Sequence, residues 1–369
     1  MGIPHDVHRR HPWPGRGLTL LLVLGAAACA RSGEGPSSGA PVLVDDAVPR
    51  VERVQRLLET LSADSMEGRE AGTPGELRAV RFLEEELARY GVEPAGEEGY
   101  RQAVVLVRPP GGERWRLLPE DADVDTVPAD RLRTAYNVLG RIPGTDPALA
   151  DDIVVVGAHH DHVGFGQAVE GDSLYNGADD DASGSVAVLE MAREMARAAR
   201  DGEGAPGRTV VAAFFTAEEM GLLGTRYWIE HPTVDFQRVV VDLQVEMIAR
   251  PDSLAGGSGR GWLTGYERTT LGDLLAARGS PIVPDPRLEM RFFFRSDNLP
   301  FAQLGIPAHT LSSYNLHTDY HQPSDEAALA DYPHMTALVE AAVSMLREIT
   351  TGPVPEWKEG GRAGLEGGR

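Results

Sequence analysis

Three short segments with the apolar character of buried strands, the first of them β-branched, constrain most strongly how this chain folds. They occupy residues 153–156, 208–219 and 238–248. The segments around them place apolar residues at near-helical spacing, over residues 76–90, 185–199 and 331–349. Buried strands that alternate with such helices predict a three-layer α/β/α fold, with a mostly parallel mixed sheet at the centre and helices on both faces. In such sheets the functional site lies beyond the carboxyl ends of the strands.

Composition excludes several classes of protein. The chain has 369 residues, of which 42% are hydrophobic and 25% charged, as is typical of a globular protein. Its net charge of −21 disfavours sequence-independent binding to nucleic-acid phosphates. The single cysteine, Cys29, excludes an intrachain disulfide and an all-cysteine zinc site.

The first residues have the pattern of an export signal. Residues 1–17 hold three arginines and one aspartate, and an apolar run of 11 residues follows over 18–28. That run is too short to span a bilayer and has the length of a signal-peptide core. It ends in "GAAAC", which resembles a bacterial lipobox, although Ala26 stands where leucine is usual. We expect a lipoprotein signal peptide over 1–28 and a lipidated Cys29; the alternative is a plain secretory signal cut near Ala28 or Ala30.

This signal implies where the protein resides. We expect an exported, cell-envelope lipoprotein, periplasmic or on the outer surface, or a secreted protein, with membrane contact only through the lipid anchor. Residues 29–46 are rich in Pro, Gly and Ser and predict a flexible tether. One folded catalytic domain is expected over 47–350. Residues 351–369 hold six Gly and two Pro and predict a disordered tail.

Polar clusters follow the apolar runs. Each cluster alone is more typical of a solvated loop. Together they comprise His159, His160, Asp161 and His162; Asp179, Asp180 and Asp181; Glu218 and Glu219; Glu246; and His317, Asp319, His321 and Asp325. Carboxylates and imidazoles that meet at one sheet edge repel or desolvate badly without a cation, and a pair of divalent metals removes that cost. A His/Asp/Glu set without thiolates favours zinc, with cobalt or manganese as lesser options.

Several motifs resemble those of a known family. They read "GAHHDH", "NGADDDASGSVAVLEMAR", "FFTAEEMGLLGTRYW", "EMIARPD", "SDNLPFAQLGIPA" and "DYHQPSDE". They occur in the order found in the di-zinc aminopeptidase Y family of clan MH, and the resemblance covers about residues 55–347. That family also contains glutamate carboxypeptidase-like enzymes and distant glutaminyl cyclases. The resemblance implies the zinc-exopeptidase fold, similar to that of phosphorylase/hydrolase-like proteins, and two zinc ions per chain.

The resemblance also implies roles for individual residues. Asp180 bridges both metals and precedes a cis peptide bond; His159 and Glu246 complete one site, and Glu219 and His321 complete the other. Asp161 orients His159, Glu218 is the general base, and Tyr320 lies beside the reacting carbonyl. Two positions depart from the family pattern, since Asp181 replaces Asn and Glu246 replaces Asp. We expect His160 and His162 to support the site or lie in its loop rather than to bind metal.

The expected reaction is hydrolysis of the N-terminal bond of a peptide substrate by a bridging metal-bound water. A carboxypeptidase remains an alternative, with Arg260, Arg291 or Arg295 binding a terminal carboxylate. A glutaminyl cyclase and a non-catalytic binding module are further alternatives. Loops 165–176, 250–266 and 285–298 are expected to shape the pocket, and Phe292, Phe293 and Phe294 either reach it or form a buried strand. The sequence leaves substrate preference and oligomeric state open.

Overall fold

The computed structural model describes residues 48–112 and 114–365. These residues belong to one compact unit, Leu43–Arg369. The predicted signal peptide, Cys29 and the tether lie outside the described residues and stay predictions. None of the described helices combines the length and apolar character that crossing a bilayer requires.

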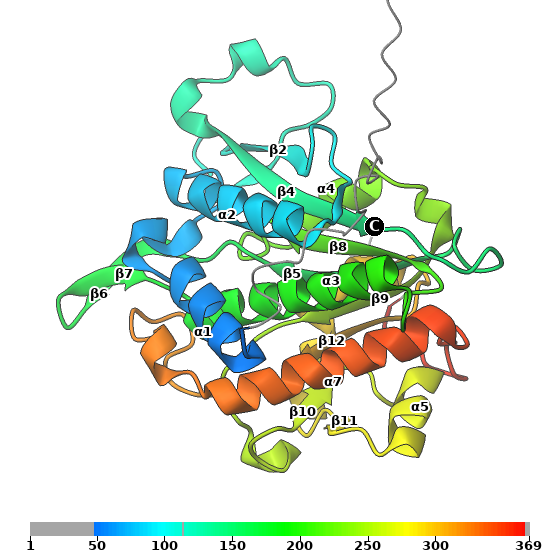
Figure 1. The fold of residues 1–369 in the computed structure, drawn as a ribbon. Coiled ribbons are helices and arrows are strands. Elements are labelled where there is room, and N and C mark those ends of the chain that lie inside the picture. The colour runs from blue at the N-terminus through cyan, green and yellow to red at the C-terminus, as the bar shows by residue number, and fades with distance from the viewer. Residues whose placement is uncertain (1–47, 113, 366–369) are drawn as a thin grey trace, which may run out of the picture. The chain divides into compact units, whose positions relative to one another are not determined.

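Among the described residues, ten strands form one mixed sheet (Figure 1). Its order is β11-β10-β12-β9-β5-β8-β4-β2-β3, and β1 pairs with β4. The four central strands are mutually parallel: β12 (Ala308–Ser312), β9 (Val239–Val245), β5 (Ile153–His159) and β8 (Thr209–Phe215). The outer strands are β1 (Glu93–Pro94), β2 (Arg101–Val107), β3 (Arg116–Leu117), β4 (Leu132–Ile142), β10 (Gly261–Leu263) and β11 (Ile282–Pro284). Antiparallel pairing therefore extends the parallel centre at both edges.

Helices cover both faces of this sheet, which confirms the predicted three layers. On the side facing the viewer in Figure 1 lie α1 (Arg50–Leu61), α2 (Pro74–Tyr90), α3 (Gly184–Asp201) and α7 (Tyr332–Thr351). The other face carries α4 (Leu223–Glu230) and α6 (Asn298–Gln303), while α5 (Thr270–Arg278) packs near β11. Side chains alternate along β5 accordingly. Val154 and Val156 join the core under α3, whereas Val155 packs with Trp228 of α4 and Phe301 of α6.

Most elements agree with the sequence-based expectations. The predicted helices correspond to α2, α3 and α7, and the predicted strands to β5, β8 and β9. The strand expected over 208–219 stops at Phe215, because Ala217 turns the chain with φ of 53°. A separate hairpin, β6 (Gly164–Val169) and β7 (Asp172–Tyr175), projects beside the sheet (Figure 1).

The C-terminal segment differs from the expected disordered tail. Its described part, residues 351–365, folds back onto the domain. The indole N–H of Trp357 donates to the main-chain oxygen of Gly305 at 2.7 Å. Leu365 is 4% exposed and packs in the same apolar cluster as Phe301. Trp357 and Leu365 therefore anchor residues 351–365 to the domain, although the glycines and prolines of this segment predicted a disordered tail.

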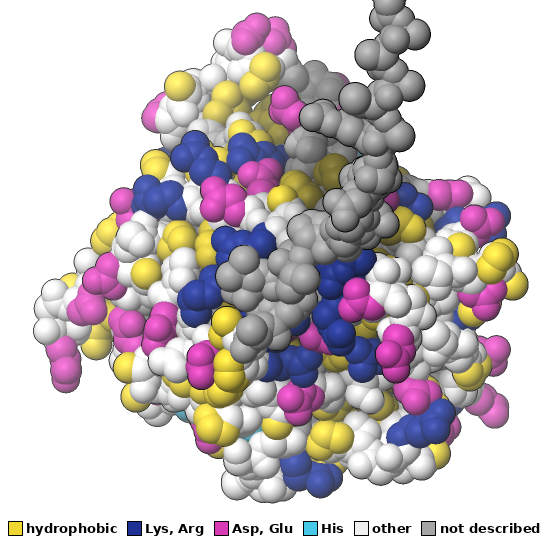
Figure 2. Space-filling view, viewed as in Figure 1, with side chains coloured by type: hydrophobic (Ala, Val, Ile, Leu, Met, Phe, Trp, Pro, Cys, Tyr) yellow, Lys and Arg dark blue, Asp and Glu magenta, His cyan; other side chains and the backbone are white. Residues whose placement is uncertain are grey.

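Ion pairs join α1 to α3. Arg53 donates to both oxygens of the buried Glu190 at 3.0 and 2.7 Å, and Arg50 lies 3.0 Å from Glu194. Figure 2 shows Lys and Arg side chains gathered across the middle of this face, interspersed with acidic ones. Because both oxygens of Glu190 are bound, the pair fixes the geometry of the two helices as well as compensating a buried charge.

A fully buried arginine connects the N-terminal segment to the loops that follow β5 and β7. Arg69 ends the short helical segment Asp64–Arg69 and is 0% exposed. Its guanidinium donates to four main-chain carbonyls: those of Leu61 and Asn176 at 2.7 Å, His160 at 2.8 Å and Gly177 at 2.9 Å. One side chain thus satisfies buried backbone acceptors from three chain segments.

Removing this guanidinium should destabilise the whole domain. Arg69→Met leaves the buried carbonyls of Leu61, His160 and Asn176 without this donor, while Gly177 keeps the backbone N–H of Ala182. We therefore expect the free energy of unfolding to fall by about 3 kcal/mol or more. Arg141→Met is the matched control, because Arg141 forms a surface ion pair with Glu93 in which both side chains are about half exposed. We expect that control to change stability by less than about 1 kcal/mol. Urea denaturation of both variants measures the difference, and equal losses would contradict the proposed role of Arg69.

Candidate metal centre

The polar residues singled out in the sequence meet at one edge of the sheet. His159 is the last residue of β5, Glu218 and Glu219 follow β8, and Glu246 directly follows β9. His321 lies in the loop after β12. Because these four strands are parallel neighbours, their carboxyl ends bring the five side chains to the same place.

Asp180 stands at the centre of this arrangement. It lies in the turn Ala178–Ser183 that leads into α3. Its Oδ1 is 3.3 Å from His159 Nε2, and its Oδ2 is 3.0 Å from His321 Nε2. His321 Nε2 is also 3.1 Å from Glu219 Oε1. The two oxygens of one carboxylate therefore face two different sets of side chains.

These side chains form two groups, and within each group the potential ligand atoms lie within 4.8 Å of one another. One group is His159, Asp180 and Glu246, and the other is His162, Asp180, Glu219 and His321. Within the described residues, several of these buried atoms have no hydrogen-bond partner: His159 Nε2, His162 Nδ1, Asp180 Oδ2, Glu219 Oε1 and His321 Nε2. Nitrogen and carboxylate atoms that converge without hydrogen bonds fit divalent cations, and this donor set suits zinc.

The structure places His162 in one of the two groups of candidate ligands. His162 was expected to support the site, and its Nδ1 lies 2.9 Å from Glu219 Oε1 and 3.8 Å from Asp180 Oδ2. Its side chain is 1% exposed. His160 instead turns away, with Nε2 3.5 Å from Glu76. The sequence offered one signal for this, because His162 belongs to the cluster of three histidines that begins at the last residue of β5.

Asp161 lies beside His159, as expected, but contacts it through the main chain rather than through the carboxylate. Its main-chain oxygen lies 3.1 Å from His159 Nδ1, whereas its carboxylate is 3.8 Å from that nitrogen. The carboxylate accepts the backbone N–H of Glu218 at 3.1 Å. A carbonyl accepts only from a protonated Nδ1, so this contact fixes the ring of His159 with its Nε2 directed toward Asp180.

Asp181, the residue that replaces the expected Asn, shapes the turn that carries Asp180. The peptide bond between Asp180 and Asp181 is cis, as the resemblance implied. Asp181 Oδ1 accepts the backbone N–H groups of Gly184 and Met247, each at 3.0 Å. Burial raises the pKa of the Asp181 carboxyl well above its usual value. Its carboxyl thus ties the turn to the end of β9.

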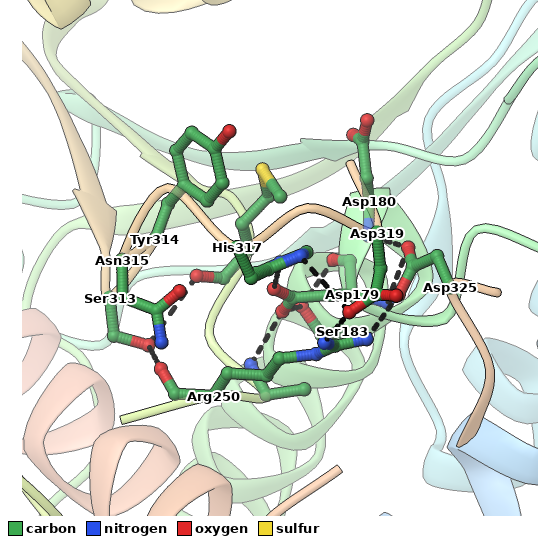
Figure 3. Close-up of polar contacts among 12 residues, drawn as sticks. Asp179, Asp180, Ser183, Arg250, Ser313, Tyr314, Asn315, His317, Asp319 and Asp325 are labelled. Carbon is green, nitrogen blue, oxygen red and sulfur yellow. Dashed lines mark hydrogen bonds and ion pairs between the residues drawn. The ribbon is translucent and has the colours of Figure 1, made fainter. Parts of the chain in front are cut away.

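A network of charged side chains holds the loop that carries His321 (Figure 3). Arg250 forms ion pairs with both Asp319 and Asp325, the residues on either side of Tyr320 and His321. The Asp325 carboxylate accepts the backbone N–H groups of Asp179 (3.1 and 3.0 Å) and Asp180 (3.0 Å). The loop and the Asp180 turn are therefore fixed to each other.

His317 joins the same network. Its Nε2 lies 2.9 Å from Asp179 Oδ2, and Asp179 Oδ1 accepts the backbone N–H of Ala249 at 2.7 Å. In Figure 3, His317 and Asp179 point toward each other, and the ring of Tyr314 packs at right angles to that of His317, with the centroids 5.3 Å apart. The structure thus places His317, Asp319 and Asp325 beside the candidate ligands as supports. Spacing along the chain offered no sign of Arg250, whose partners lie about 70 residues away.

A cleft with an empty volume of about 520 Å³ opens beside the two groups. Its lining includes Glu218, whose Oε2 is 3.9 Å from His159 Nε2, and Tyr320, whose ring stacks on His321 at 3.9 Å. Burial raises the pKa of the Glu218 carboxyl well above its usual value, and Glu219 adds to the effect. Burial also raises the pKa of Tyr320, so its hydroxyl keeps its proton at neutral pH.

Two of the three loops expected to shape the pocket line this cleft. Residues 250–266 contribute Trp262 and Thr264, and residues 285–298 contribute Phe292, Arg295 and Ser296. The third loop, 165–176, forms the β6–β7 hairpin and contributes no lining residue. The segment around the three phenylalanines is not the alternative buried strand, because it forms two short helical turns, Leu288–Met290 and Phe292–Phe294.

The chain is similar in sequence to known aminopeptidases. The chain is 30% identical over 181 residues to a probable leucine aminopeptidase 2 of Aspergillus fumigatus, a match that covers 48% of this chain and 32% of that protein. It spans about a third of the length of the first curated relatives it matches.

Solved structures share the fold at low sequence identity. One is the zinc aminopeptidase BSAP from Bacillus subtilis (TM-score 0.58, 15% identity, 81% of this chain and 94% of that one). Another is the glutaminyl cyclase of Porphyromonas gingivalis (TM-score 0.56, 16% identity, 81% of this chain and 98% of that one). The sequence pattern of peptidase family M28 matches residues 137–346, which is more than half of the chain. The chain therefore belongs to peptidase family M28.

Proposed function

We propose that this protein is a zinc-dependent exopeptidase, and specifically an aminopeptidase that removes N-terminal residues from peptides. The observation that carries this proposal is the pair of ligand groups that share Asp180, with the carboxylate of Glu218 beside them in an open cleft. Membership of peptidase family M28 and relatives that are named aminopeptidases support the same reaction.

The proposed ligand set extends the one implied by the sequence. His159, Asp180 and Glu246 would hold one zinc ion, and Asp180, Glu219 and His321 the other, with His162 as an additional ligand. Cobalt or manganese would suit the same donors. When bound, such a pair lowers the pKa of water toward neutrality and polarises a substrate carbonyl.

Glu218 is placed to act as the general base. It lines the cleft, lies outside both ligand groups, and has its backbone N–H held by the buried carboxylate of Asp161. In the proposed reaction its carboxylate accepts a proton from water and later donates it to the leaving amine. Tyr320 keeps its proton and is placed to donate a hydrogen bond to the developing oxyanion.

Three alternatives have less support in the site. A glutaminyl cyclase shares the fold, but the resemblance attributes a single metal to such enzymes, whereas this chain brings two ligand groups together. A non-catalytic module would not require the full set of ligands and a free carboxylate. A carboxypeptidase needs a basic group for the substrate's terminal carboxylate; of the three arginines considered, Arg295 lines the cleft, while Arg260 and Arg291 do not.

Replacing the proposed base should abolish turnover while leaving the metal centre intact. We expect Glu218→Gln to lower kcat by about 100- to 10,000-fold, because proton transfer is lost while zinc content and Tm stay unchanged. Glu340→Gln, a change at a side chain 60% exposed on α7, is the control. The assay compares aminoacyl and N-blocked peptide substrates with and without chelator. Full turnover by zinc-loaded Glu218→Gln would remove Glu218 from this role, and cleavage of blocked peptides alone would overturn the aminopeptidase assignment.

Metal analysis tests the ligand set. We expect close to two zinc ions per chain, and we expect His162→Asn to weaken one of them by at least about tenfold, since it removes one of four ligands. His160→Asn is the matched control, because His160 is equally buried but faces Glu76. Competition with a chromophoric chelator gives both affinities, and thermal unfolding checks that each variant folds. Equal zinc affinity in His162→Asn and the wild type would exclude His162 as a ligand.

A further inference from the structure

The charges that line the cleft are unevenly distributed. Its acidic side chains are Asp180, Glu218, Glu219 and Glu246, all within the proposed catalytic centre. One cation, Arg295, shares the lining with them. No ion pair links Arg295 to an acid anywhere in residues 48–112 and 114–365, and its side chain is exposed at the cleft. The cleft therefore presents one uncommitted positive charge.

Aromatic side chains hold Arg295 in place. Its guanidinium carbon lies 5.3 Å from the ring centroid of Phe292, and Phe292 stacks on Trp262 at 5.2 Å with an interplanar angle of 26°. Tyr314 meets the edge of Phe292 at 5.9 Å. An arginine whose flat face rests on a ring keeps its N–H groups free for a planar anion such as a carboxylate. This wall of the cleft thus positions the cation without neutralising it.

The same wall contains a second donor without a partner. Trp262 lines the cleft and is 2% exposed, and its indole N–H has no acceptor among the described residues. A buried N–H without a partner is rare and calls for an explanation. The hydroxyls nearby are already engaged, since Ser312 donates to Met247 and Thr310 donates to Asn298. The Trp262 N–H is enclosed below the cleft surface, so Arg295 is the cation that a ligand in the cleft can reach. A guanidinium only donates hydrogen bonds, which favours an anionic ligand that carries acceptors.

We propose that Arg295 binds a carboxylate of the peptide substrate. The inference rests on the proposed peptidase function and adds to it a substrate class that an apolar pocket would not select. The carboxylate has two possible sources. It is either the acidic side chain of a substrate residue or the C-terminal carboxylate of a short peptide, and the chemistry of recognition is the same.

Four substrates in two matched pairs distinguish these sources with the zinc-loaded full chain. Glutamyl- and leucyl-anilides differ in a side-chain carboxylate, and leucylglycine and its amide differ in a C-terminal one. We expect Arg295→Gln to lower kcat/KM for one carboxylate-bearing member by about 10- to 100-fold, the range for a charge-assisted hydrogen bond. Its neutral counterpart should change by less than about twofold. The substrate pair in which the variant loses the preference for the carboxylate-bearing member shows whether the bound carboxylate is that of a side chain or of the C-terminus.

Arg291→Gln is the matched control. Arg291 lies four residues away, and its guanidinium also rests on a phenylalanine, 4.7 Å from the ring centroid of Phe294, but it does not line the cleft. We expect this variant to keep the wild-type preference. An equal loss on all four substrates in Arg295→Gln, no loss on any, or the same change in Arg291→Gln would each overturn the inference.

A binding measurement separates this inference from the proposed function. Calorimetry compares glutamate with glutamine, and leucylglycine with its amide, in the wild type and Arg295→Gln. Tighter binding of the carboxylate member, lost in the variant, would support the inference even if no peptide were hydrolysed. Equal binding within both pairs would refute it even if chelator-sensitive aminopeptidase activity were present.

Discussion

The sharing of Asp180 between two groups of side chains is the constraint on which the rest of the site depends. One carboxylate faces His159 with one oxygen and His321 with the other, while Glu218, Glu219 and Glu246 line the same cleft. So many buried carboxylates would repel one another without compensating positive charge. The proposed pair of zinc ions supplies that charge, and the same charge is what activates water for peptide hydrolysis.

The surrounding structure fixes this carboxylate from several directions. The backbone N–H of Asp180 is bound by Asp325, and Asp325 in turn pairs with Arg250. Arg69 ties the backbone at His160 to the loop that precedes Asp180. These supports come from segments far apart in sequence, so the centre is built by the fold as a whole rather than by any one motif. A site held on all sides has little reorganisation to undergo when a metal binds.

The sequence predicted the layers and most of the site, because β-branched runs, helical spacing and strand-end polar residues are local signals. It gave no signal where contacts between distant segments of the chain decide the structure. The resemblance assigns one histidine of the cluster to metal and implies support from His162; the fold adds that His162 Nδ1 lies 2.9 Å from Glu219 Oε1. Residues 351–365 pack on the domain because Trp357 reaches Gly305, which composition alone does not reveal. Arg69 and Arg250 act only through partners that folding brings to them.

The most direct test of this account is a crystal structure of the zinc-loaded protein with anomalous scattering at the zinc edge. The account predicts two anomalous peaks at the carboxyl ends of β5, β8 and β9, with one oxygen of Asp180 bound to each ion. His159 and Glu246 should complete one site, and His162, Glu219 and His321 the other. A single peak, or two peaks that do not share Asp180, would contradict the account.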